Sequence, residues 1–261
     1  MTIHRKNGIS YFTFSILEQL GITHGIFMRH GGVSGEPWSS LNMATSVGDS
    51  RENVIENRRR ITACLDRCSD SIYDVWQVHS NRVDYTSSPR PLTAPHKKAD
   101  AIVTDKLNIT LLMLFADCVP ILFYDKKNNV AAIAHAGWQG TVKRVVVKTI
   151  NVMVEKHNCS KDDLIACIGP SICADHYPVG NDVVDAASKE LEDIGQTLIN
   201  KNGNIHFDLQ NTNKHLIEKE GVHTIQMADI CTAENTIDWF SHRAESGKTG
   251  RFAAVMSCLD M

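Results

Sequence analysis

Short apolar runs separated by turn residues predict strands along most of the chain. Two runs lie near the start, at 9–14 and 24–29. A denser group follows in the middle of the sequence, at 74–79, 101–104, 109–115, 119–124 and 130–135, and two later runs lie at 164–168 and 251–258. Apolar runs of this length, bounded by turn residues, are typical of buried strands. The pattern therefore predicts a protein built around β-sheet.

Apolar residues at helical spacing predict helices between and after these strands. A helix over 141–157 has a buried stripe, formed by Val142, Val145, Val146, Ile150 and Met153. Two more helices are predicted over 182–193 and 208–220. Asp49, with Glu52 three residues later, resembles a capping box that begins a helix ending near residue 65.

Strands gathered in the middle of the chain, with helices interspersed, predict a mixed α/β (α+β) fold in which central mixed β-sheets are flanked by helices. Residues 87–98 contain Pro89, Pro91 and Pro95 and are predicted to form one long surface loop rather than a domain boundary. We therefore expect residues 1–261 to form a single domain.

Composition and charge narrow the class of protein. Of the 261 residues, 43% are hydrophobic and 22% are charged, which is ordinary for a soluble globular chain. The formal net charge of −3 gives no basic surplus, so neither nucleic acid nor a membrane surface is expected as a partner. Residues 1–8 lack the apolar stretch of a signal peptide, and the apolar region 109–124 is too short to span a bilayer. We expect a cytoplasmic protein.

Standard catalytic and metal-binding fingerprints are missing from the sequence. The eight cysteines include no Cys-x-x-Cys pair, and they are expected to be reduced thiols or metal ligands rather than disulfides. The chain also lacks the Gly-x-Gly-x-x-Gly, His-Glu-x-x-His and deaminase-type zinc signatures. The sequence therefore gives no support for the functions that these fingerprints mark.

Three predicted strand ends carry side chains suited to chemistry. They are Gln77-Val78-His79-Ser80, Ala116-Asp117-Cys118-Val119-Pro120 and His135-Ala136-Gly137-Trp138. Each alone is typical of core packing, but two imidazoles and a thiolate together suit zinc, and also copper. Three protein ligands leave a fourth position open, as in catalytic sites. The wide spacing of the three residues requires a preformed fold, and spacing alone does not establish that they meet.

Further motifs extend the pattern toward both ends of the chain. The N-terminal half contains Met28-Arg29-His30-Gly31-Gly32-Val33-Ser34, Leu41-Asn42, Val47-Gly48-Asp49 and Glu56-Asn57-Arg58. The C-terminal half contains Ile168-Gly169-Pro170-Ser171-Ile172-Cys173, Tyr177-Pro178-Val179-Gly180, Ser241-His242-Arg243 and Gly250-Arg251. With the three central motifs, in order over nearly the whole chain, these residues resemble the YfiH-like family. That family is labelled multicopper polyphenol oxidoreductase or laccase, and is also described as purine nucleoside phosphorylase.

The resemblance implies a metal site formed by His79, Cys118 and His135, with Zn²⁺ as the metal and Cu²⁺ as the alternative. It also implies phosphorolysis of adenosine, inosine and methylthioadenosine, with adenosine deamination as a side activity. Small-molecule purine nucleosides and phosphate are then the expected partners. Gln139 departs from the family pattern, which commonly has arginine there, so an anion contact from this position is not expected.

Within this hypothesis the remaining site residues have distinct roles. Arg29 and Arg58 are the candidates for binding phosphate, because a guanidinium group forms a bidentate fork with that anion, and both are expected to face one cavity. Asn42 is grouped with them as a substrate-binding residue. Asp117, beside the cysteine, is a candidate proton shuttle, although a carboxylate there could equally accept hydrogen bonds from backbone amides.

Three other functions use the same residues. A copper-dependent polyphenol oxidase is disfavoured because none of the 12 histidines forms a His-x-His pair. A hydrolase would use Cys118 as nucleophile and His79 or His135 as base. A purely structural zinc site is disfavoured because it would have three ligands rather than four.

Overall fold

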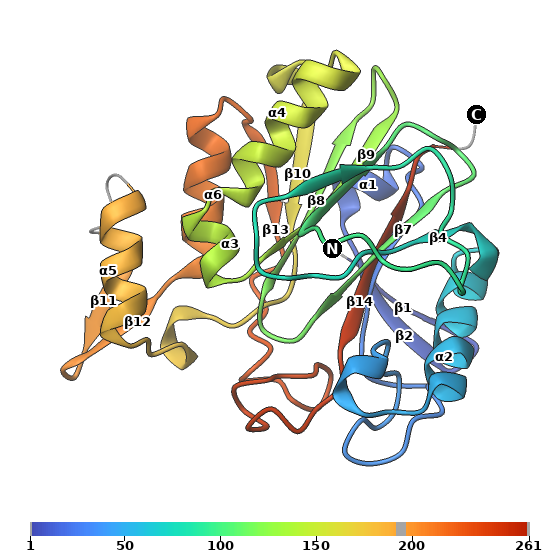
Figure 1. The fold of residues 1–261 in the computed structure, drawn as a ribbon, viewed down its shortest axis with the longest axis horizontal. Coiled ribbons are helices and arrows are strands. Elements are labelled where there is room, and N and C mark those ends of the chain that lie inside the picture. Colours follow the sequence, from blue (N-terminus) through green and yellow to red (C-terminus); the bar gives the residue numbers. More distant parts are fainter. Residues whose placement is uncertain (1, 192–196, 260–261) are drawn as a thin grey trace.

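Two mixed six-stranded β-sheets pack face to face at the centre of the molecule (Figure 1). The structure is a computed structural model that describes residues 2–191 and 197–259. The first sheet has the order β1 (Thr2–Lys6), β2 (Ile9–Thr13), β3 (His24–Phe27), β14 (Phe252–Ser257), β7 (Thr110–Phe115), β4 (Ile72–Tyr73). The second has the order β13 (Thr224–Met227), β10 (Leu164–Ile168), β8 (Val119–Asp125), β9 (Val130–Ala136), β6 (Ala101–Thr104), β5 (Val83–Tyr85).

Both sheets mix parallel and antiparallel pairs. The pairs β4–β7, β5–β6 and β10–β13 are parallel, and the other neighbours are antiparallel. Helices pack on the outer faces, so the expected α+β fold with central mixed sheets is confirmed.

Alternate residues of each central strand face different layers of the core. In β14, Phe252, Ala254 and Met256 lie between the two sheets, whereas Ala253 and Val255 face the outer layer. In β9, Ile133 lies between the sheets and Ala134 faces the helices of the second sheet. Both faces of these strands are buried, which explains why the sequence shows continuous apolar runs rather than alternation.

The helices form the two outer layers. α2 (Arg51–Cys64) covers the first sheet, and α4 (Val145–His157) and α6 (Leu209–Lys219) cover the second. The remaining α-helices are α1 (Ser15–Glu18), α3 (Trp138–Val142) and α5 (Asn181–Glu190). α5 lies beside the hairpin β11 (Leu198–Lys201)–β12 (Asn204–Phe207), at the left of Figure 1. None of the described helices combines the length and apolar character needed to span a bilayer.

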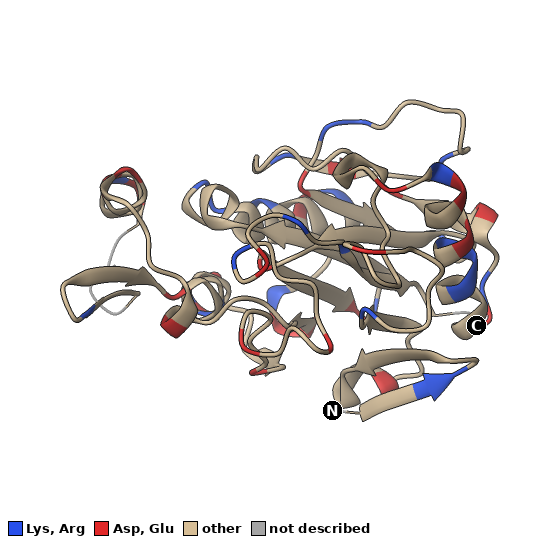
Figure 2. Ribbon diagram, turned by 90° about the horizontal axis from the view of Figure 1, so that it is seen from below, with Lys and Arg blue, Asp and Glu red and all other residues tan. Residues whose placement is uncertain are grey.

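Charged residues are interspersed over the surrounding helices and loops. Figure 2 shows segments of both signs on these outer elements, whereas the strands at the centre are mostly uncharged. This arrangement matches a core that is apolar on both faces of each sheet.

A predicted strand and a predicted helix differ from the structure. The strand over 74–79 is wrong: β4 ends at Tyr73, and the following segment is irregular because the side chain of Gln77, rather than a strand backbone, pairs with the backbone of Leu114 on β7. The helix over 141–157 is divided into α3 and α4, because Arg144 takes a left-handed conformation with φ 58°.

The beginning of α2 is a further correction. Its N-cap is Ser50, whose hydroxyl accepts from the Asn53 N–H at 3.1 Å, and not Asp49. The Asp49 carboxylate instead accepts from Ser34 Oγ at 2.6 Å and from Asn42 Nδ2 at 2.8 Å. The expected helix 182–193 ends at Glu190 in α5, and its last two positions lie outside the described residues.

Candidate functional site

Three side chains from separate segments of the chain meet at one end of the second sheet. The metal-binding atoms of His79, Cys118 and His135 all lie within 4.8 Å of one another. Cys118 immediately precedes β8 and His135 lies near the end of β9, and the pairing of Pro120 with His135 places these two ends side by side. His79 arrives from the irregular segment after β4, with its ring centroid 4.9 Å from that of His135. The structure thus brings together all three expected ligands.

A buried carboxylate, Asp100, organises this cluster. His135 Nδ1 donates to Asp100 Oδ1 at 3.0 Å, which leaves Nε2 of His135 as its free ligand atom. The same carboxylate accepts from the backbone N–H groups of Val78, His79 and Ser80, at 3.2, 3.0 and 2.6 Å. One side chain therefore positions two of the three clustered residues.

The electrostatics around His135 favour positive charge. Burial alone would lower the pKa of His135, but its interactions with Cys118 and Asp100 outweigh burial and raise this pKa to about 9. Burial would likewise raise the pKa of Asp100, but the hydrogen bonds from His135 and Ser80 lower it to about 2. A cluster that stabilises a cation suits a metal ion.

Gly137 borders the space between the clustered atoms. A Cβ at this position would lie 2.8 Å from Cys118 Sγ and 2.9 Å from His79 Nδ1. Any larger residue would therefore displace these groups. Two imidazoles and a thiol around a space kept open by a glycine fit a zinc or copper ion.

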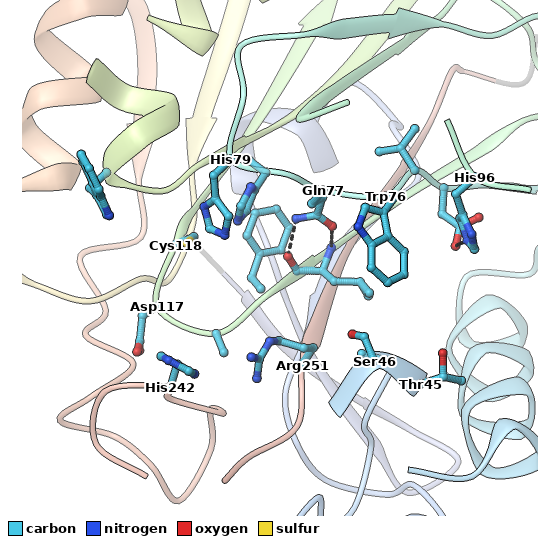
Figure 3. Close-up of a pocket in the computed structure, with 18 of the residues that line it drawn as sticks. Thr45, Ser46, Trp76, Gln77, His79, His96, Asp117, Cys118, His242 and Arg251 are labelled. Carbon is cyan, nitrogen blue, oxygen red and sulfur yellow. Dashed lines mark hydrogen bonds and ion pairs between the residues drawn. The ribbon is translucent and has the colours of Figure 1, made fainter. Parts of the chain in front are cut away.

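The cluster opens into a cavity of about 490 Å³, within the range of roughly 300–1,000 Å³ that holds small ligands (Figure 3). The cavity is lined by Ala44, Thr45, Ser46, Arg58, Asp74, Val75, Trp76, Gln77, His79, His96, Leu114, Phe115, Ala116, Asp117, Cys118, His135, Trp138, Tyr177, His242, Arg243 and Arg251. In Figure 3, Arg251 and His242 lie across from His79 and Gln77. The cavity thus combines metal-binding, cationic and aromatic groups.

The two predicted phosphate-binding arginines are separated. Arg58 lines the cavity, where its Nη1 donates to Asp74 Oδ2 at 2.7 Å and its Nη2 to the Met43 carbonyl at 3.0 Å. Arg29 does not line the cavity. Its guanidinium donates to the Thr236 carbonyl at 2.7 Å and pairs with Glu245 at 3.0 Å. The expectation that both arginines face one cavity is therefore wrong for Arg29, because other partners hold its side chain elsewhere.

Asn42 and Asp117 hold neighbouring segments in place. Asn42 is fully buried, and its Oδ1 accepts from the Arg251 backbone N–H at 2.9 Å, so it positions a cavity residue without lining the cavity itself. Asp117 lines the cavity, and its carboxylate accepts from Thr232 Oγ1 at 2.8 Å and from the Arg243 N–H at 2.6 Å. Both oxygens of Asp117 therefore anchor the C-terminal loops.

Sequence reasoning did not assign Asp100 or Arg251 to the site. Within the described part of the chain, the Arg251 guanidinium meets the carbonyls of Thr249 and Gly250 and pairs with no carboxylate. Burial lowers the pKa of Arg251, although Cys118 and Asp117 act in the opposite direction. Gly250-Arg251 is one of the motifs shared with the family, and that motif was the sequence signal that could have assigned Arg251 to the site. Asp100 gave no comparable signal, because a single acid before a strand is common.

Gln139 does not line the cavity. Its Oε1 accepts from Lys143 Nζ at 3.1 Å, and the same ammonium group donates to the His79 carbonyl at 3.0 Å. The absence of an anion contact from Gln139 remains a prediction.

The comparisons with known proteins cover almost the whole chain. Residues 23–259 match the model of a family described as "Multi-copper polyphenol oxidoreductase laccase". A protein of Deinococcus radiodurans named purine nucleoside phosphorylase is 35% identical over 237 residues, which are 91% of this chain and 89% of that protein. Purine nucleoside phosphorylase YlmD of Bacillus subtilis is 33% identical over 242 residues, 89% of this chain and 87% of that one.

The fold has close solved neighbours. The crystal structure of YlmD from Geobacillus stearothermophilus superposes with a TM-score of 0.91 at 28% sequence identity, covering 98% of both chains. The family match covers residues 23–259, and the structural likeness covers 98% of the chain.

Proposed function

We propose that this chain, which belongs to the multi-copper polyphenol oxidoreductase laccase family (the YfiH-like family indicated by its motifs), is a purine nucleoside phosphorylase. In this reaction the bond between the purine nitrogen and C1′ of the ribose breaks, and a phosphate oxygen forms the new bond to C1′. The purine base leaves with a proton and ribose-1-phosphate is the second product. The names of the relatives and the composition of the cavity support this proposal.

The observation that carries the proposal is the guanidinium of Arg251 in the same cavity as the His79–Cys118–His135 cluster. Arg251 has no carboxylate partner among the described residues, so its charge is available to an anion. Arg58 shares its charge with Asp74, which also accepts from Arg90 at 2.6 Å. We therefore assign phosphate binding to Arg251, with Arg58 as the second cation.

Aromatic side chains in the same cavity offer surfaces for a purine ring. Trp76, Trp138 and Tyr177 all line it, and the Arg243 guanidinium lies 4.7 Å from the centre of the Tyr177 ring. Flat apolar groups with a few polar neighbours are the usual setting for a heteroaromatic ligand. Adenosine, inosine and methylthioadenosine share the purine and differ at the ring substituent or at the 5′ position.

The expected metal is Zn²⁺, held by His79, Cys118 and His135, with Cu²⁺ as the alternative. When bound, zinc lowers the pKa of a coordinated water toward neutrality, which is the chemistry that adenosine deamination requires. The chain's own contribution is to fix the ligands: Asp100 holds His135 and the segment carrying His79. Asp117, with both carboxylate oxygens accepting hydrogen bonds, acts in this proposal by positioning the loop of Arg243.

The setting we propose for this reaction is the cytoplasm. All eight cysteines are free thiols in the structure, which suits a reducing compartment.

The test is incubation of the purified protein with each nucleoside, with and without inorganic phosphate, followed by identification of the products. Free purine and ribose-1-phosphate, formed only when phosphate is present, are the expected result. Inosine formed from adenosine without phosphate would report the deaminase side activity. Free ribose would identify a hydrolase instead, and no product from any of the three nucleosides would overturn the proposal.

The family label suggests a different reaction, copper-dependent oxidation of phenols. The same preparation separates the two activities. Metal analysis of protein purified without added copper, combined with an assay of oxygen uptake on a phenol, should show zinc and no oxidation. Copper at one ion per site together with oxygen uptake would favour the oxidase.

A further inference from the structure

A second group of soft ligands lies outside the cavity. The metal-binding atoms of Cys173, His176 and Cys231 also lie within 4.8 Å of one another, and none of these residues lines the cavity described above. The proposed reaction assigns them no role. Two cysteines and a histidine that converge from separate segments call for an explanation of their own.

Local backbone structure places the first two residues together. Ala174–His176 forms a 3₁₀ turn that Cys173 caps, and the His176 N–H donates to the Cys173 carbonyl at 3.2 Å. The turn brings the two side chains together, so that Cys173 Sγ lies 3.2 Å from His176 Nδ1.

A backbone bridge brings the third residue to the same place. Ser171 and Cys231 form an isolated parallel bridge, in which the Thr232 N–H donates to the Ser171 carbonyl at 3.1 Å. The Cys173 N–H also points to Cys231 Sγ, at 3.3 Å. The cluster is thus held by the fold, and not by the side chains alone.

The distances match those between ligands that share one ion. His176 Nδ1 lies 3.2 Å from Cys173 Sγ and 3.5 Å from Cys231 Sγ. A nitrogen at about 2.0–2.1 Å and a sulfur at about 2.3 Å from a tetrahedral ion are separated by roughly 3.5 Å. His176 is exposed, Cys173 is half-buried and Cys231 is buried, so the cluster opens to solvent on one side. An ion could enter there and keep water as its fourth ligand.

We propose that Cys173, His176 and Cys231 form a second metal site, which binds a thiolate-preferring divalent cation of the zinc type. Two thiolates and one imidazole select such an ion over Mg²⁺ or Ca²⁺, which take oxygen ligands. The case for this site does not rest on the proposed nucleoside reaction.

The position of the site gives it a structural consequence. His176 directly precedes Tyr177, and Cys231 directly precedes Thr232, whose hydroxyl donates to Asp117. Tyr177 and Asp117 both line the cavity, on either side of Arg243. An ion bound by the cluster would tie the 173–177 segment to the 231–243 segment and so fix one wall of the cavity.

The test counts bound ions in the full-length protein. After reconstitution with Zn²⁺ and removal of excess metal, the unmodified chain should contain two ions, and the His176→Ala and Cys173→Ser variants should each contain one. His176 is exposed, so its replacement removes a ligand without opening the core. The matched control is His223→Ala, at an exposed histidine that belongs to neither cluster, which should keep two ions.

Reconstitution with Co²⁺ identifies which site each variant has lost. The ion left in His79→Ala should show stronger sulfur-to-cobalt charge-transfer absorption than the ion left in His176→Ala, because two thiolates rather than one contact it. Loss of an ion in His176→Ala but not in His79→Ala would support this second site and contradict the first. Full metal content in both His176→Ala and Cys173→Ser would overturn the proposal. So would a Cys173–Cys231 disulfide in protein purified and analysed under reducing conditions.

Discussion

At the scale of single residues, replacing Cys118 distinguishes two roles for this residue, metal ligand and nucleophile. The Cys118→Ser variant should lose zinc affinity and phosphorolysis together, because serine is a poor zinc ligand, and added zinc should restore part of the activity. Zinc titration and product assays on the same samples measure both effects. Cys68→Ser, at an exposed cysteine, is the control. Loss of turnover with normal zinc content, or a covalent substrate adduct on Cys118, would instead identify a nucleophile.

Arg251 and Arg29 should respond differently to removal. Arg251→Ala should raise the KM for phosphate at least tenfold, because the cation that we assign to phosphate is lost. A hydrogen bond to a charged group contributes about 1.5–3 kcal/mol of binding free energy. Arg29→Ala should lower the melting temperature, since it breaks the half-buried pair with Glu245, and should leave this KM unchanged. Steady-state kinetics and thermal unfolding compare the two. A phosphate KM that rises only in Arg29→Ala would reverse the assignment.

His24 should make stability depend on pH. Its Nε2 accepts from the Phe14 N–H at 2.8 Å, and burial lowers its pKa in the folded chain. The unfolded chain, with a histidine pKa near about 6.5, then binds a proton that the folded chain does not. The contribution of His24 to the free energy of unfolding is therefore complete above about pH 6.5 and declines as the pH falls, by up to about 1.4 kcal/mol per pH unit.

Urea unfolding between pH 5 and 8 measures this effect. The His24→Gln variant keeps an acceptor for the Phe14 N–H and should show a smaller slope of stability against pH below pH 6.5. His223→Gln, at an exposed position, should keep the slope of the unmodified chain. Equal slopes for the unmodified chain and His24→Gln would contradict the assignment.

At the scale of elements, substitutions at the beginning of α2 test whether Ser50 is its N-cap. Ser50→Ala should cost about 1 kcal/mol of stability, because the Asn53 N–H loses its acceptor. Glu52→Gln, at the other position of the predicted capping box, should change stability by less than about 0.5 kcal/mol. Denaturant midpoints at pH 7 measure both changes. A larger loss of stability in Glu52→Gln than in Ser50→Ala would instead support the capping box of Asp49 and Glu52.

The sequence predicted elements best where burial alone decides the pattern. The strands at 101–104 and 164–168 match β6 and β10 residue for residue, because both faces of each are buried and, apart from Thr104, the residues are apolar. The edge strands β1 and β13 were missed, because each exposes one or more sides and resembles a loop in composition. β11 and β12 were missed for the same reason.

Features that depend on single residues could not be predicted from the pattern of apolar and polar positions. Nothing in the spacing of valines over 141–157 reveals the left-handed Arg144 that separates α3 from α4. The cluster of His79, Cys118 and His135 was found from residue type, and its ligand role stays a prediction. Asp100 was missed because its importance comes from four partners far along the chain: the N–H groups of residues 78–80 and the His135 ring.

At the scale of the whole molecule, we propose that residues 1–261 fold as one cooperative unit. The core between the sheets contains Phe252 and Met256 of β14 together with Ile133 of β9, so the inner faces of the two sheets share one hydrophobic cluster. Hydrogen exchange with mass spectrometry at increasing urea should show β14 and β9 losing protection at the same concentration. Separate midpoints for the two sheets, or proteolytic halves that stay folded, would divide the chain into two domains.

The loop that carries His79 is fastened to both sheets, to β7 through Gln77 and to the start of β6 through Asp100. Cys118 and His135 stand on neighbouring strands, so the three proposed ligands come together only when the two layers have closed. In the site that we propose, an ion would therefore not seed the folding of the chain as it does in small metal-dependent domains. We expect metal acquisition to follow folding, as a maturation step of the finished protein. The occupancy of the proposed site in a cell would then depend on supply and exchange of the ion, and an apo form would persist wherever delivery lags behind synthesis.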